Sequence, residues 1–343
     1  FKRLLMKIAV FFGGNSAERD VSIASGFQVI TALRKIGHEV ISVDTARGLL
    51  TIQEEQQLIE KGVDTTPFDG RNLSITHEQA NQLTKATRLK SVDVVFLALH
   101  GGTGEDGTIQ AFLDLAGLPY TGSGHKASAN AMDKDISKQL FRYTGVPTAN
   151  WLMMPVSNQE IIDKIGLPAV IKSNKQGSTV GLTIVKKPED IEAAIQKAYL
   201  HDDEVMIEKY IDGRELTVGI LDETALSVGE IIPKCSDHFD YESKYQVGGA
   251  EEIFPADLSE EETELIKELG LKAHKVLKLE GYSRVDFRLD TKGQLWCLEA
   301  NTLPGMTATS LLPQSANVLG IDFPNLCEKI CQLAIAHFEK SLL

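Results

Sequence analysis

Short apolar runs alternate with helical periodicity over the first 125 residues. The run KIAVFF from Lys7 to Phe12 predicts a strand, SIASGFQVITALRKIG (22–37) predicts a helix, and HEVISVD (38–44) predicts a second strand. The later run VDVVFLALH (92–100) is apolar almost throughout, which is typical of a strand inside a parallel sheet. This order predicts a doubly wound α/β domain that ends near the turn-rich YTGSG at 120–124.

The pattern changes after this turn. A helical segment at 127–145 is followed by the predicted strands LPAVIKS, GLTIVKK and EVMIEKYI, with the helix PEDIEAAIQKAYL before the last of them. From residue 213 the pattern predicts strands ELTVGIL and ALSVGEII, a helix at 259–279, a hairpin of SRVDFRLD and QLWCLEAN, and a C-terminal helix. We therefore predict three domains, at residues 1–125, 126–212 and 213–343.

Composition and charge exclude several classes of protein. With 43% hydrophobic and 24% charged residues, the 343-residue chain has the composition of a globular protein. A formal charge of -13 repels a phosphate backbone, so we expect no nucleic-acid partner. No apolar run approaches the roughly 20 residues that span a bilayer, and Lys7 interrupts the N-terminal run before a signal sequence could form. We expect a soluble cytoplasmic protein without a membrane partner.

The cysteines fit the same expectation. They show no CxxC spacing and are too few for a disulfide scaffold, which predicts reduced thiols in a cytosolic compartment. Two of them lie one helical turn apart, where burial in a core is the simplest interpretation. The four residues are Cys235, Cys297, Cys327 and Cys331.

Two carboxylates meet on the predicted hairpin at 283–301. Alternation gives it a polar face with Arg284, Asp286, Arg288, Cys297, Glu299 and Asn301, and an apolar face with Val285, Phe287, Leu289, Trp296 and Leu298. Reflection about the turn places Asp286 opposite Glu299, where like charges destabilise the strand pair. A divalent cation removes that cost, because carboxylate and amide oxygens suit Mg²⁺. The alternative is a solvated face with a salt bridge from Arg284 or Arg288.

Two glycine-containing segments are candidates for phosphate binding. GTGEDG (102–107) matches GxGxxG, but it lies outside the first βα turn and lacks the later acidic residue, which disfavours a dinucleotide site. In VIKSNKQGSTVGLTIV, Lys172 precedes a loop whose N–H and hydroxyl groups could close over phosphates. A plain hairpin is the alternative there. Farther on, Glu208 and Lys209 end a strand where a nucleotide edge could be read, unless the segment is only a charged linker.

Nine segments occur in an order that resembles one family. They are GGNSAERDVSIASG, LHGGTGEDGTIQ, YTGSG, MDK, KQGSTVG, EKYIDGRELTV, DYESKY, RVD and LEANTLPGMTATSLLP. They are spread along nearly the whole chain, and the chain is similar to the D-alanine–D-alanine ligases of the ATP-grasp superfamily. The resemblance implies an N-terminal doubly wound parallel-sheet domain followed by a two-lobed ATP-grasp fold. It also implies that ATP joins two D-alanines through a D-alanyl phosphate, giving D-alanyl-D-alanine, ADP and phosphate for peptidoglycan synthesis.

The resemblance assigns roles to individual residues. Two Mg²⁺ ions, or Mn²⁺, are implied at Asp286, Glu299 and Asn301. ATP contacts are implied at Lys134, Lys172, Ser178, Glu208, Lys209 and Glu215. Contacts to the two D-alanines are implied at Glu18, His100, Lys244 and Ser310. An oxyanion hole is implied at Arg284 and the Gly305 N–H, and a trio that closes the lid at Glu18, Ser178 and Tyr245. The catalytic set is Glu18, Ser178, Tyr245, Arg284, Gly305 and Ser310.

Several of these residues have simpler alternatives. Asn15 and Glu18 have the spacing of a capping box at a helix start, and His100 as a lone histidine could be structural. The segment at 234–254 is either a surface loop or a substrate lid, and the resemblance favours the lid. Ser173 stands where the family often has proline and Gln176 where it often has glutamate, which bears on ATP affinity rather than on reaction type.

The sequence is also compatible with two other functions. The first is an ATP-grasp ligase that joins D-alanine to another amino or hydroxy acid. The Lys244-Tyr245 pair favours the dipeptide-forming type instead. The second is an ATP-binding regulatory module, which would not require an oxyanion site. The resemblance further implies a homodimer.

Overall fold

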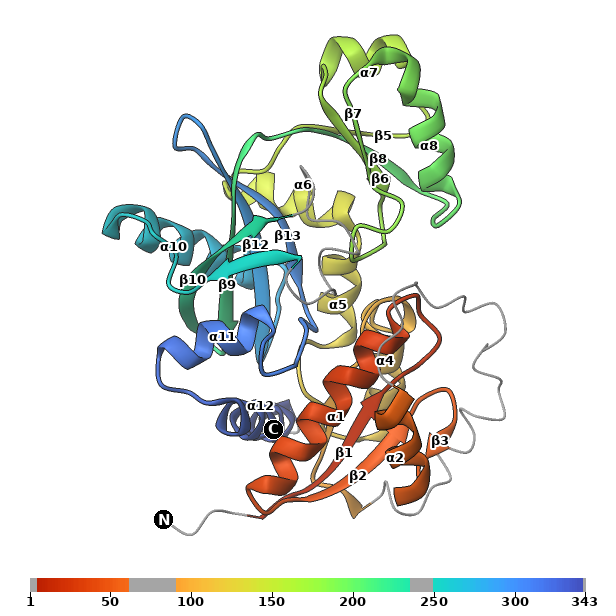
Figure 1. Ribbon diagram of the computed structural model, residues 1–343, viewed down its shortest axis with the longest axis vertical. Helices are drawn as coiled ribbons and strands as arrows, with labels where there is room; N and C mark the ends of the chain where they lie inside the picture. Colours follow the sequence, from red (N-terminus) through yellow and green to blue (C-terminus); the bar gives the residue numbers. More distant parts are fainter. Residues whose placement is uncertain (1–4, 62–90, 235–248, 342–343) are drawn as a thin grey trace.

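The computed structural model describes residues 5–61, 91–234 and 249–341, and these form three lobes with one sheet each (Figure 1). The N-terminal lobe lies at one end of the molecule, and the other two lobes face each other above it. This arrangement confirms the predicted fold class. The domain boundaries at 125 and 212 stay a prediction.

The N-terminal lobe is built on a mainly parallel sheet. Its strand order is β3 (Gly48–Leu49), β2 (Glu39–Asp44), β1 (Lys7–Phe12) and β4 (Val94–Leu97). β1 pairs in parallel with β2 on one side and with β4 on the other, and β3 adds an antiparallel edge. The strand predicted at 7–12 is confirmed with the same bounds. Because the strand order reverses between β1 and β4, a crevice for ligands is expected where these two strands end.

Helices cover this sheet and close its core. They are α1 (Arg19–Lys35), α2 (Ile52–Lys61), α4 (Thr108–Ala116) and, from the far end of the chain, α12 (Phe323–Ser341). The helix predicted from residue 22 thus begins three residues earlier, at Arg19. α12 packs against α1 and β4, and it buries Cys327 and Cys331 in the same apolar core as Phe11 and Phe96. The predicted burial of these two cysteines is confirmed.

The central lobe is an antiparallel sheet with two helices. Its strand order is β5 (Trp151–Met153), β8 (Val205–Lys209), β6 (Ala169–Ser173) and β7 (Thr183–Val185), and its helices are α7 (Asn158–Lys164) and, after the short η4 (Pro188–Asp190), α8 (Ile191–Tyr199). The strands predicted here are confirmed with shorter bounds. α8 covers the sheet and contributes Ile191 and Ile195 to a third apolar core.

The helical segment predicted at 127–145 is two helices rather than one. α5 (His125–Met132) ends at Asp133, whose extended backbone starts α6 (Lys134–Thr144) in a new direction. The Asp133 carboxylate accepts a hydrogen bond from the Ile136 N–H at 3.0 Å, so it is the N-cap of the second helix. This break places Lys134 at the first position of α6, beside the cleft described below.

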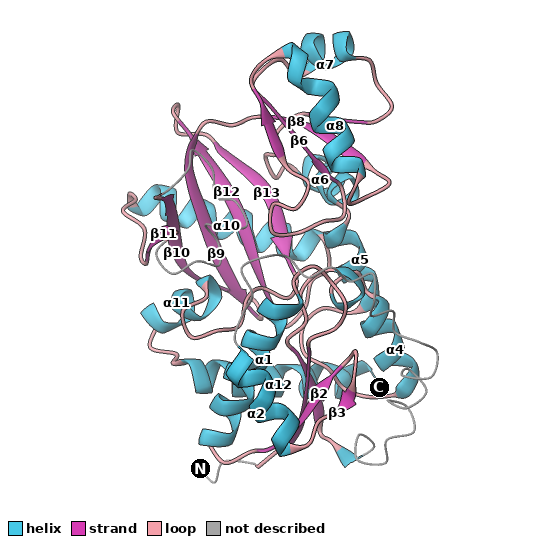
Figure 2. Cartoon of the chain, turned by 45° about the vertical axis from the view of Figure 1, so that its right-hand side comes forward, coloured by secondary structure: helices cyan, strands magenta, loops and turns pink. Residues whose placement is uncertain are grey.

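The C-terminal lobe is a five-stranded antiparallel sheet (Figure 2). Its strand order is β11 (Ala250–Ile253), β10 (Thr224–Pro233), β9 (Gly213–Leu221), β12 (Tyr282–Asp290) and β13 (Leu295–Asn301). α10 (Glu260–Val276) packs against β9, β10 and β12, and α11 (Leu311–Val318) against β9 and β10. The predicted hairpin of β12 and β13 is confirmed, and Asp286 pairs with Glu299 as expected.

One part of the predicted hairpin alternation is wrong. The register shifts so that Asp286 pairs with Glu299 while Phe287 pairs with Cys297, which leaves Leu298 as an extra residue on β13. The bulge turns the Cys297 side chain into the apolar core, where it is fully buried. Leu298 instead joins Glu299 in lining the cleft, and Trp296 pairs with Arg288.

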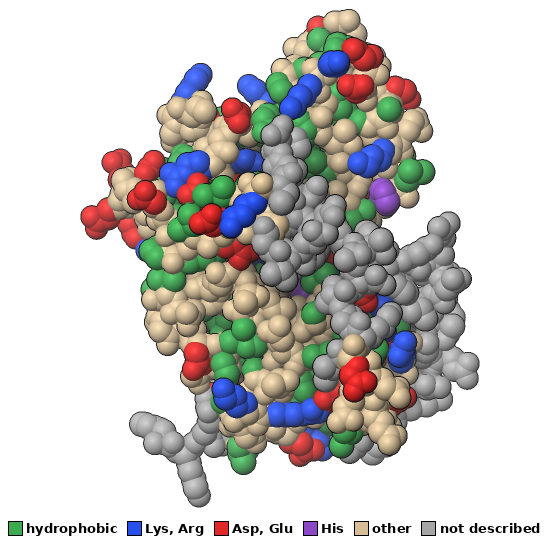
Figure 3. Space-filling view, in the orientation of Figure 1, with side chains coloured by type: hydrophobic (Ala, Val, Ile, Leu, Met, Phe, Trp, Pro, Cys, Tyr) green, Lys and Arg blue, Asp and Glu red, His purple; other side chains and the backbone are tan. Residues whose placement is uncertain are grey.

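The surface carries both signs of charge. Figure 3 shows Lys and Arg side chains interspersed with Asp and Glu, and acidic side chains gathered over α10. The first turn of α10 carries Glu260, Glu261 and Glu262, where the positive end of the helix dipole favours negative charge. Within the described ranges, no helix is long and apolar enough to cross a membrane.

Candidate functional site

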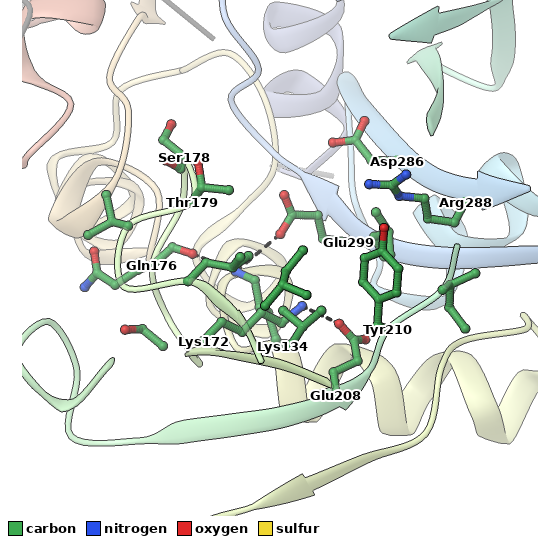
Figure 4. Close-up of a pocket in the computed structure, with 18 of the residues that line it drawn as sticks. Lys134, Lys172, Gln176, Ser178, Thr179, Glu208, Tyr210, Asp286, Arg288 and Glu299 are labelled. Atoms are coloured by element: carbon green, nitrogen blue, oxygen red, sulfur yellow. Dashed lines mark hydrogen bonds and ion pairs between the residues drawn. The ribbon is translucent and has the colours of Figure 1, made fainter. Parts of the chain in front are cut away.

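A cleft between the central sheet and the C-terminal sheet collects half of the predicted site residues (Figure 4). They come from α6, β6, the loop after β6, β8, β9, β12 and β13. The predicted residues that line it are Lys134, Lys172, Ser178, Glu208, Lys209, Glu215, Asp286 and Glu299. Segments that lie as much as 165 residues apart in the sequence, such as those of Lys134 and Glu299, therefore form one surface.

The carboxylates of the hairpin are both ion-paired. Arg284 donates to Asp286 from Nε at 2.9 Å and from Nη2 at 2.7 Å. The Lys134 Nζ lies 3.3 Å from Glu299 Oε2. Thr217 Oγ1 and Asn301 Nδ2 also donate to Asp286, at 2.7 and 2.9 Å. The salt bridge from Arg284 that the sequence left as an alternative is therefore present.

The donor set at this point fits a divalent cation. No group of three or more His, Cys, Asp or Glu suited to a metal occurs in the described part of the chain. The predicted ligands are instead two carboxylates and an amide: Asp286 opposite Glu299, with the Asn301 amide against Asp286. Mg²⁺ uses few protein carboxylates and completes its shell with water and substrate phosphate. The residues present are compatible with that mode of binding.

A buried cluster of three charges lies at the cleft, which two of its members, Lys172 and Glu208, line. The Glu208 carboxylate receives the ammonium groups of Lys172, at 2.7 Å, and of Lys138. Lys138 is fully buried and also donates to Thr148 Oγ1 at 2.5 Å. Burial opposes the ionisation of Glu208, but the two lysines outweigh it and lower the pKa of Glu208 to about 2. Glu208 is therefore an ionised acceptor.

Lys138 was not predicted as a site residue, although its position in the helical pattern could have indicated it. On α6 the buried residues are Lys134, Ser137, Lys138 and Phe141, which have the spacing of one helix face. A lysine on the apolar stripe of a helix needs a buried anionic partner. That requirement would have pointed from Lys138 to a carboxylate such as Glu208.

The loop after β6 reaches across to the N-terminal lobe. Ser178 Oγ donates a hydrogen bond to Glu18 Oε1, and the Lys134 Nζ donates to the Gln176 carbonyl at 2.8 Å. Ser178 and Thr179 have φ angles of 49° and 60°, which are uncommon for residues other than glycine and are found at functional loops. The predicted link between Ser178 and Glu18 is present, whereas Tyr245 and Lys244 lie outside the described residues.

The two departures from the family pattern bond to the adjacent helix and turn. Ser173 Oγ donates to the Ala198 carbonyl at 3.0 Å, and Gln176 Nε2 donates to the His201 carbonyl at 3.0 Å. Both side chains thus stabilise the base of the loop. This placement agrees with an influence on loop stiffness rather than on chemistry.

Glu18 and His100 follow the ends of β1 and β4, and His100 lines the small pocket at the expected crevice. Glu18 is the N-cap residue of α1, but its side chain makes no capping hydrogen bond, so the capping-box interpretation of Asn15 and Glu18 is wrong. Its carboxylate faces Gly101, where a Cβ would come within 2.7 Å of Glu18 Oε2 at a φ of +67°. A glycine is required at this close approach.

Both ring nitrogens of His100 bond to protein groups. Nδ1 lies 3.0 Å from the Leu303 carbonyl, and Nε2 lies 2.9 Å from Ser25 Oγ. Burial lowers the pKa of His100, so the ring is neutral. A structural role for His100 thus has direct support, and contact with a D-alanine stays a prediction.

Glu105 is a second residue that the sequence reasoning did not single out. Its carboxylate accepts from the Gly101 N–H at 2.8 Å and from the Leu303 N–H at 3.3 Å. Burial, followed by the neighbouring Glu18 carboxylate, raises the pKa of Glu105 to about 7. The signal was an acidic residue inside the glycine-rich segment after β4, where backbone N–H groups converge.

Of the remaining predicted residues, Gly305 and Ser310 follow the end of β13, while Glu215 and Lys209 lie at the edge of the cleft. Gly305 lies next to Ser310, whose Oγ accepts from the Thr307 N–H at 3.1 Å. Ser310 is the N-cap residue of α11. Glu215 pairs with Arg288 at 3.1 Å at the edge of the cleft, and Lys209 is exposed there.

Two family models match the chain over most of its length. The model described as D-ala D-ala ligase N-terminus matches residues 7–123, and the model described as D-ala D-ala ligase C-terminus matches residues 135–332. Together they include the N-terminal lobe and both walls of the cleft.

Named relatives and solved structures agree with these matches. The chain is 40% identical over 329 residues to the D-alanine–D-alanine ligase of Geobacter sulfurreducens, covering 94% of this chain and 92% of that protein. It is 42% identical over 328 residues to the D-alanine–D-alanine ligase of Citrifermentans bemidjiense, covering 96% of each. The solved D-alanine–D-alanine ligase of Bacillus anthracis in complex with ATP is 33% identical, with a TM-score of 0.76 over 98% of this chain and 99% of that one. The solved D-alanine–D-alanine ligase of Coxiella burnetii is 27% identical, with a TM-score of 0.79 over 98% of this chain and 96% of that one.

Proposed function

The chain belongs to the D-alanine–D-alanine ligase family, and on this premise we propose how its cleft joins two molecules of D-alanine. It is an ATP-dependent ligase that forms D-alanyl-D-alanine for peptidoglycan synthesis, with ATP and D-alanine as substrates. The observation that carries the assignment of roles is the convergence of Lys134, Asp286 and Glu299 on one cleft that the Ser178 loop links to Glu18.

The reaction has two steps. A carboxylate oxygen of the first D-alanine attacks the γ-phosphorus of ATP, the bond to the bridging oxygen breaks, and ADP leaves. The amino group of the second D-alanine then attacks the acyl carbon, loses a proton, and expels phosphate together with that carboxylate oxygen. Positioning and charge stabilisation are the main tasks of the protein in the first step.

The floor and walls of the cleft suit ATP. Lys134 and Lys172 place positive charge where the phosphates would lie, under the loop at 176–181. Because Glu208 stays ionised beside two lysines, it is an acceptor for an amino group on the edge of the base. Lys209 and Glu215 at the edge of the cleft complete the proposed ATP contacts.

Asp286, Glu299 and Asn301 would hold Mg²⁺, or Mn²⁺ in its place. The bound metal would neutralise charge on the phosphates during transfer. Arg284 and Lys134 compensate the charges of the two carboxylates. Cation binding would therefore free both basic side chains to face the reacting groups.

The crevice of the N-terminal lobe suits the first D-alanine. Glu18 would bind its ammonium group, and the hydrogen bond from Ser178 holds that carboxylate in place. Arg284 and the Gly305 N–H would stabilise the oxyanion that develops when the second D-alanine attacks. Ser310, with Lys244, would bind the carboxylate of the second D-alanine, and Tyr245 would complete the closing trio. A homodimer in the cytoplasm is proposed on the family resemblance.

Identification of the product tests the substrate assignment. Purified protein with Mg-ATP would be supplied with D-alanine, with L-alanine, or with D-alanine plus D-lactate. Released phosphate would be measured, and the products would be identified by mass spectrometry. We expect phosphate release matched by D-alanyl-D-alanine and only with the D-enantiomer. A depsipeptide as the main product of the mixture would instead favour a ligase that joins D-alanine to a hydroxy acid.

A further inference from the structure

The loop at 302–306 that carries Gly305 is attached to the N-terminal lobe by three hydrogen bonds. The Leu303 N–H donates to Glu105 Oε1 at 3.3 Å, and the Leu303 carbonyl lies 3.0 Å from His100 Nδ1. The Met306 N–H donates to Ser25 Oγ at 3.3 Å. We call residues 302–306 the oxyanion loop. All three partners belong to another lobe, at least 198 residues away in the sequence.

The directions of these bonds are fixed by chemistry. A carbonyl only accepts, so His100 Nδ1 carries the hydrogen that is donated to Leu303. In the neutral ring, Nε2 is then an acceptor and receives the Ser25 hydroxyl hydrogen at 2.9 Å. The oxygen of Ser25 remains able to accept from the Met306 N–H. Each donor is matched to an acceptor, and the network has one consistent arrangement.

The oxyanion loop exposes one residue and buries the rest. Thr302, Leu303 and Met306 are at most 3% exposed, whereas Gly305 is partly exposed. Within the described part of the chain, the Gly305 N–H has no hydrogen-bond partner, while the N–H groups of Met306 and Thr307 donate to Ser25 and Ser310. The network thus orients the peptide groups on either side of the Gly305 N–H, which is left to bind a ligand.

We propose that Ser25, His100 and Glu105 are positioning residues that aim the Gly305 N–H at the developing oxyanion. Apolar packing of Leu303 and Met306 sets the depth of the loop, and the hydrogen bonds set the rotation of its peptide planes. This inference rests on the proposed role of Gly305. It assigns a catalytic consequence to a contact between lobes that the proposed function does not use.

A matched pair of serine variants separates positioning from stability. Ser25 and Ser22 both lie on α1 and are fully buried with two hydrogen bonds each, but Ser22 bonds to Gly13 and Ala98 within its own lobe. Ser25→Ala removes both the acceptor for Met306 and the donor for His100. Ser22→Ala is the control for the loss of a buried hydroxyl.

The test combines kinetics with hydrogen exchange. For Ser25→Ala and Glu105→Ala we expect kcat for D-alanyl-D-alanine to fall by roughly 10- to 100-fold, because a misplaced catalytic donor costs about that much. The KM for ATP should stay within about twofold of its normal value. Amide exchange in the peptide that covers 302–307 should accelerate in both variants. Ser22→Ala should show neither effect, although we expect its melting temperature to fall as much as that of Ser25→Ala.

The outcomes distinguish this inference from the proposed function. Wild-type protein that does not form D-alanyl-D-alanine would overturn the proposed function. If the wild type is active and Ser25→Ala and Glu105→Ala keep their kcat, or if exchange at 302–307 is unchanged, only the positioning role is overturned. A loss of kcat in Ser22→Ala equal to that in Ser25→Ala would also overturn it, since a general loss of stability would then explain both.

Discussion

Asp286 lies directly opposite Glu299 on the paired strands β12 and β13, and each carboxylate is held by a different basic residue. Arg284 pairs with Asp286 and Lys134 with Glu299. Like charges at paired positions are unfavourable unless a cation lies between them or near them. The hairpin thus keeps two carboxylates together at the point where the central and C-terminal lobes face each other.

Replacement of Asp286 tests the proposed metal site. Asp286→Asn should lower phosphoryl transfer by about 100-fold or more, because a carboxylate ligand is lost, while the KM for D-alanine changes little. Steady-state kinetics at several Mg²⁺ concentrations measure both. Glu230→Gln is a matched control, since Glu230 is an equally buried carboxylate on the same sheet that pairs with Arg214 at 2.7 Å. Normal turnover of Asp286→Asn would contradict the metal assignment.

Lys138 should support both ATP binding and stability. Lys138→Met leaves the buried Glu208 with one lysine instead of two, and we expect a loss of about 3 kcal/mol in the free energy of unfolding and a higher KM for ATP. Urea unfolding and ATP titration measure these effects. The exposed pair of Lys164 and Glu160 provides the comparison, because Lys164→Met should cost only about 0.5 kcal/mol. Equal effects of the two substitutions would refute the role of the buried cluster.

Ser178 is also a proposed ATP contact, but its loss should affect the binding of D-alanine more than that of ATP. Its hydroxyl donates to Glu18, the residue proposed to bind the first ammonium group. Ser178→Ala removes this link between lobes, and the KM for D-alanine should rise about tenfold, in line with the loss of a hydrogen bond to a charged group. A rise in the KM for ATP, with the KM for D-alanine unchanged, would contradict the proposed role of Ser178 in binding D-alanine.

His274 gives the protein a dependence of stability on pH. Burial, with a smaller effect of Lys275, lowers the pKa of His274 from 6.5 to about 4, although Asp222 opposes the shift. Because the folded pKa lies below the unfolded one, this stabilisation is present above pH 6.5 and is lost as the pH falls toward 4. Between pH 8 and pH 5 the wild type should lose about 2 kcal/mol more than His274→Gln in urea unfolding. Parallel losses in the two proteins would show that another group is responsible.

Local patterns predicted the hairpin register but not its irregularity. A short turn at 290–293 and strict alternation fix which residues face each other near the turn, and this placed Asp286 opposite Glu299 correctly. The bulge at Leu298 has no marker such as glycine, so the alternation predicted the wrong face for Cys297. A bulge of this kind depends on contacts made outside the hairpin, such as the hydrogen bond from the Cys297 N–H to the Pro147 carbonyl at 2.7 Å.

Contacts between lobes were the least accessible from the sequence. The bond from Ser178 to Glu18 joins residues 160 positions apart, and neither residue has a local pattern that predicts the other. The family resemblance supplied that pair, while the local spacing of Asn15 and Glu18 offered helix capping as an alternative role for Glu18. Lys138 and Glu105 were missed because a lysine on a buried helix face and an acid in a glycine-rich loop have meaning only once their partners are located.

The most direct test of the mechanism follows the carboxylate oxygen of D-alanine. If ATP phosphorylates that carboxylate, D-alanine labelled with ¹⁸O in both carboxyl oxygens must transfer one label to phosphate for every dipeptide formed. Mass spectrometry of the released phosphate measures the transfer. We predict one ¹⁸O atom per phosphate, matched to D-alanyl-D-alanine. Formation of the dipeptide with unlabelled phosphate would contradict a D-alanyl phosphate intermediate and with it the roles given to Arg284 and Gly305.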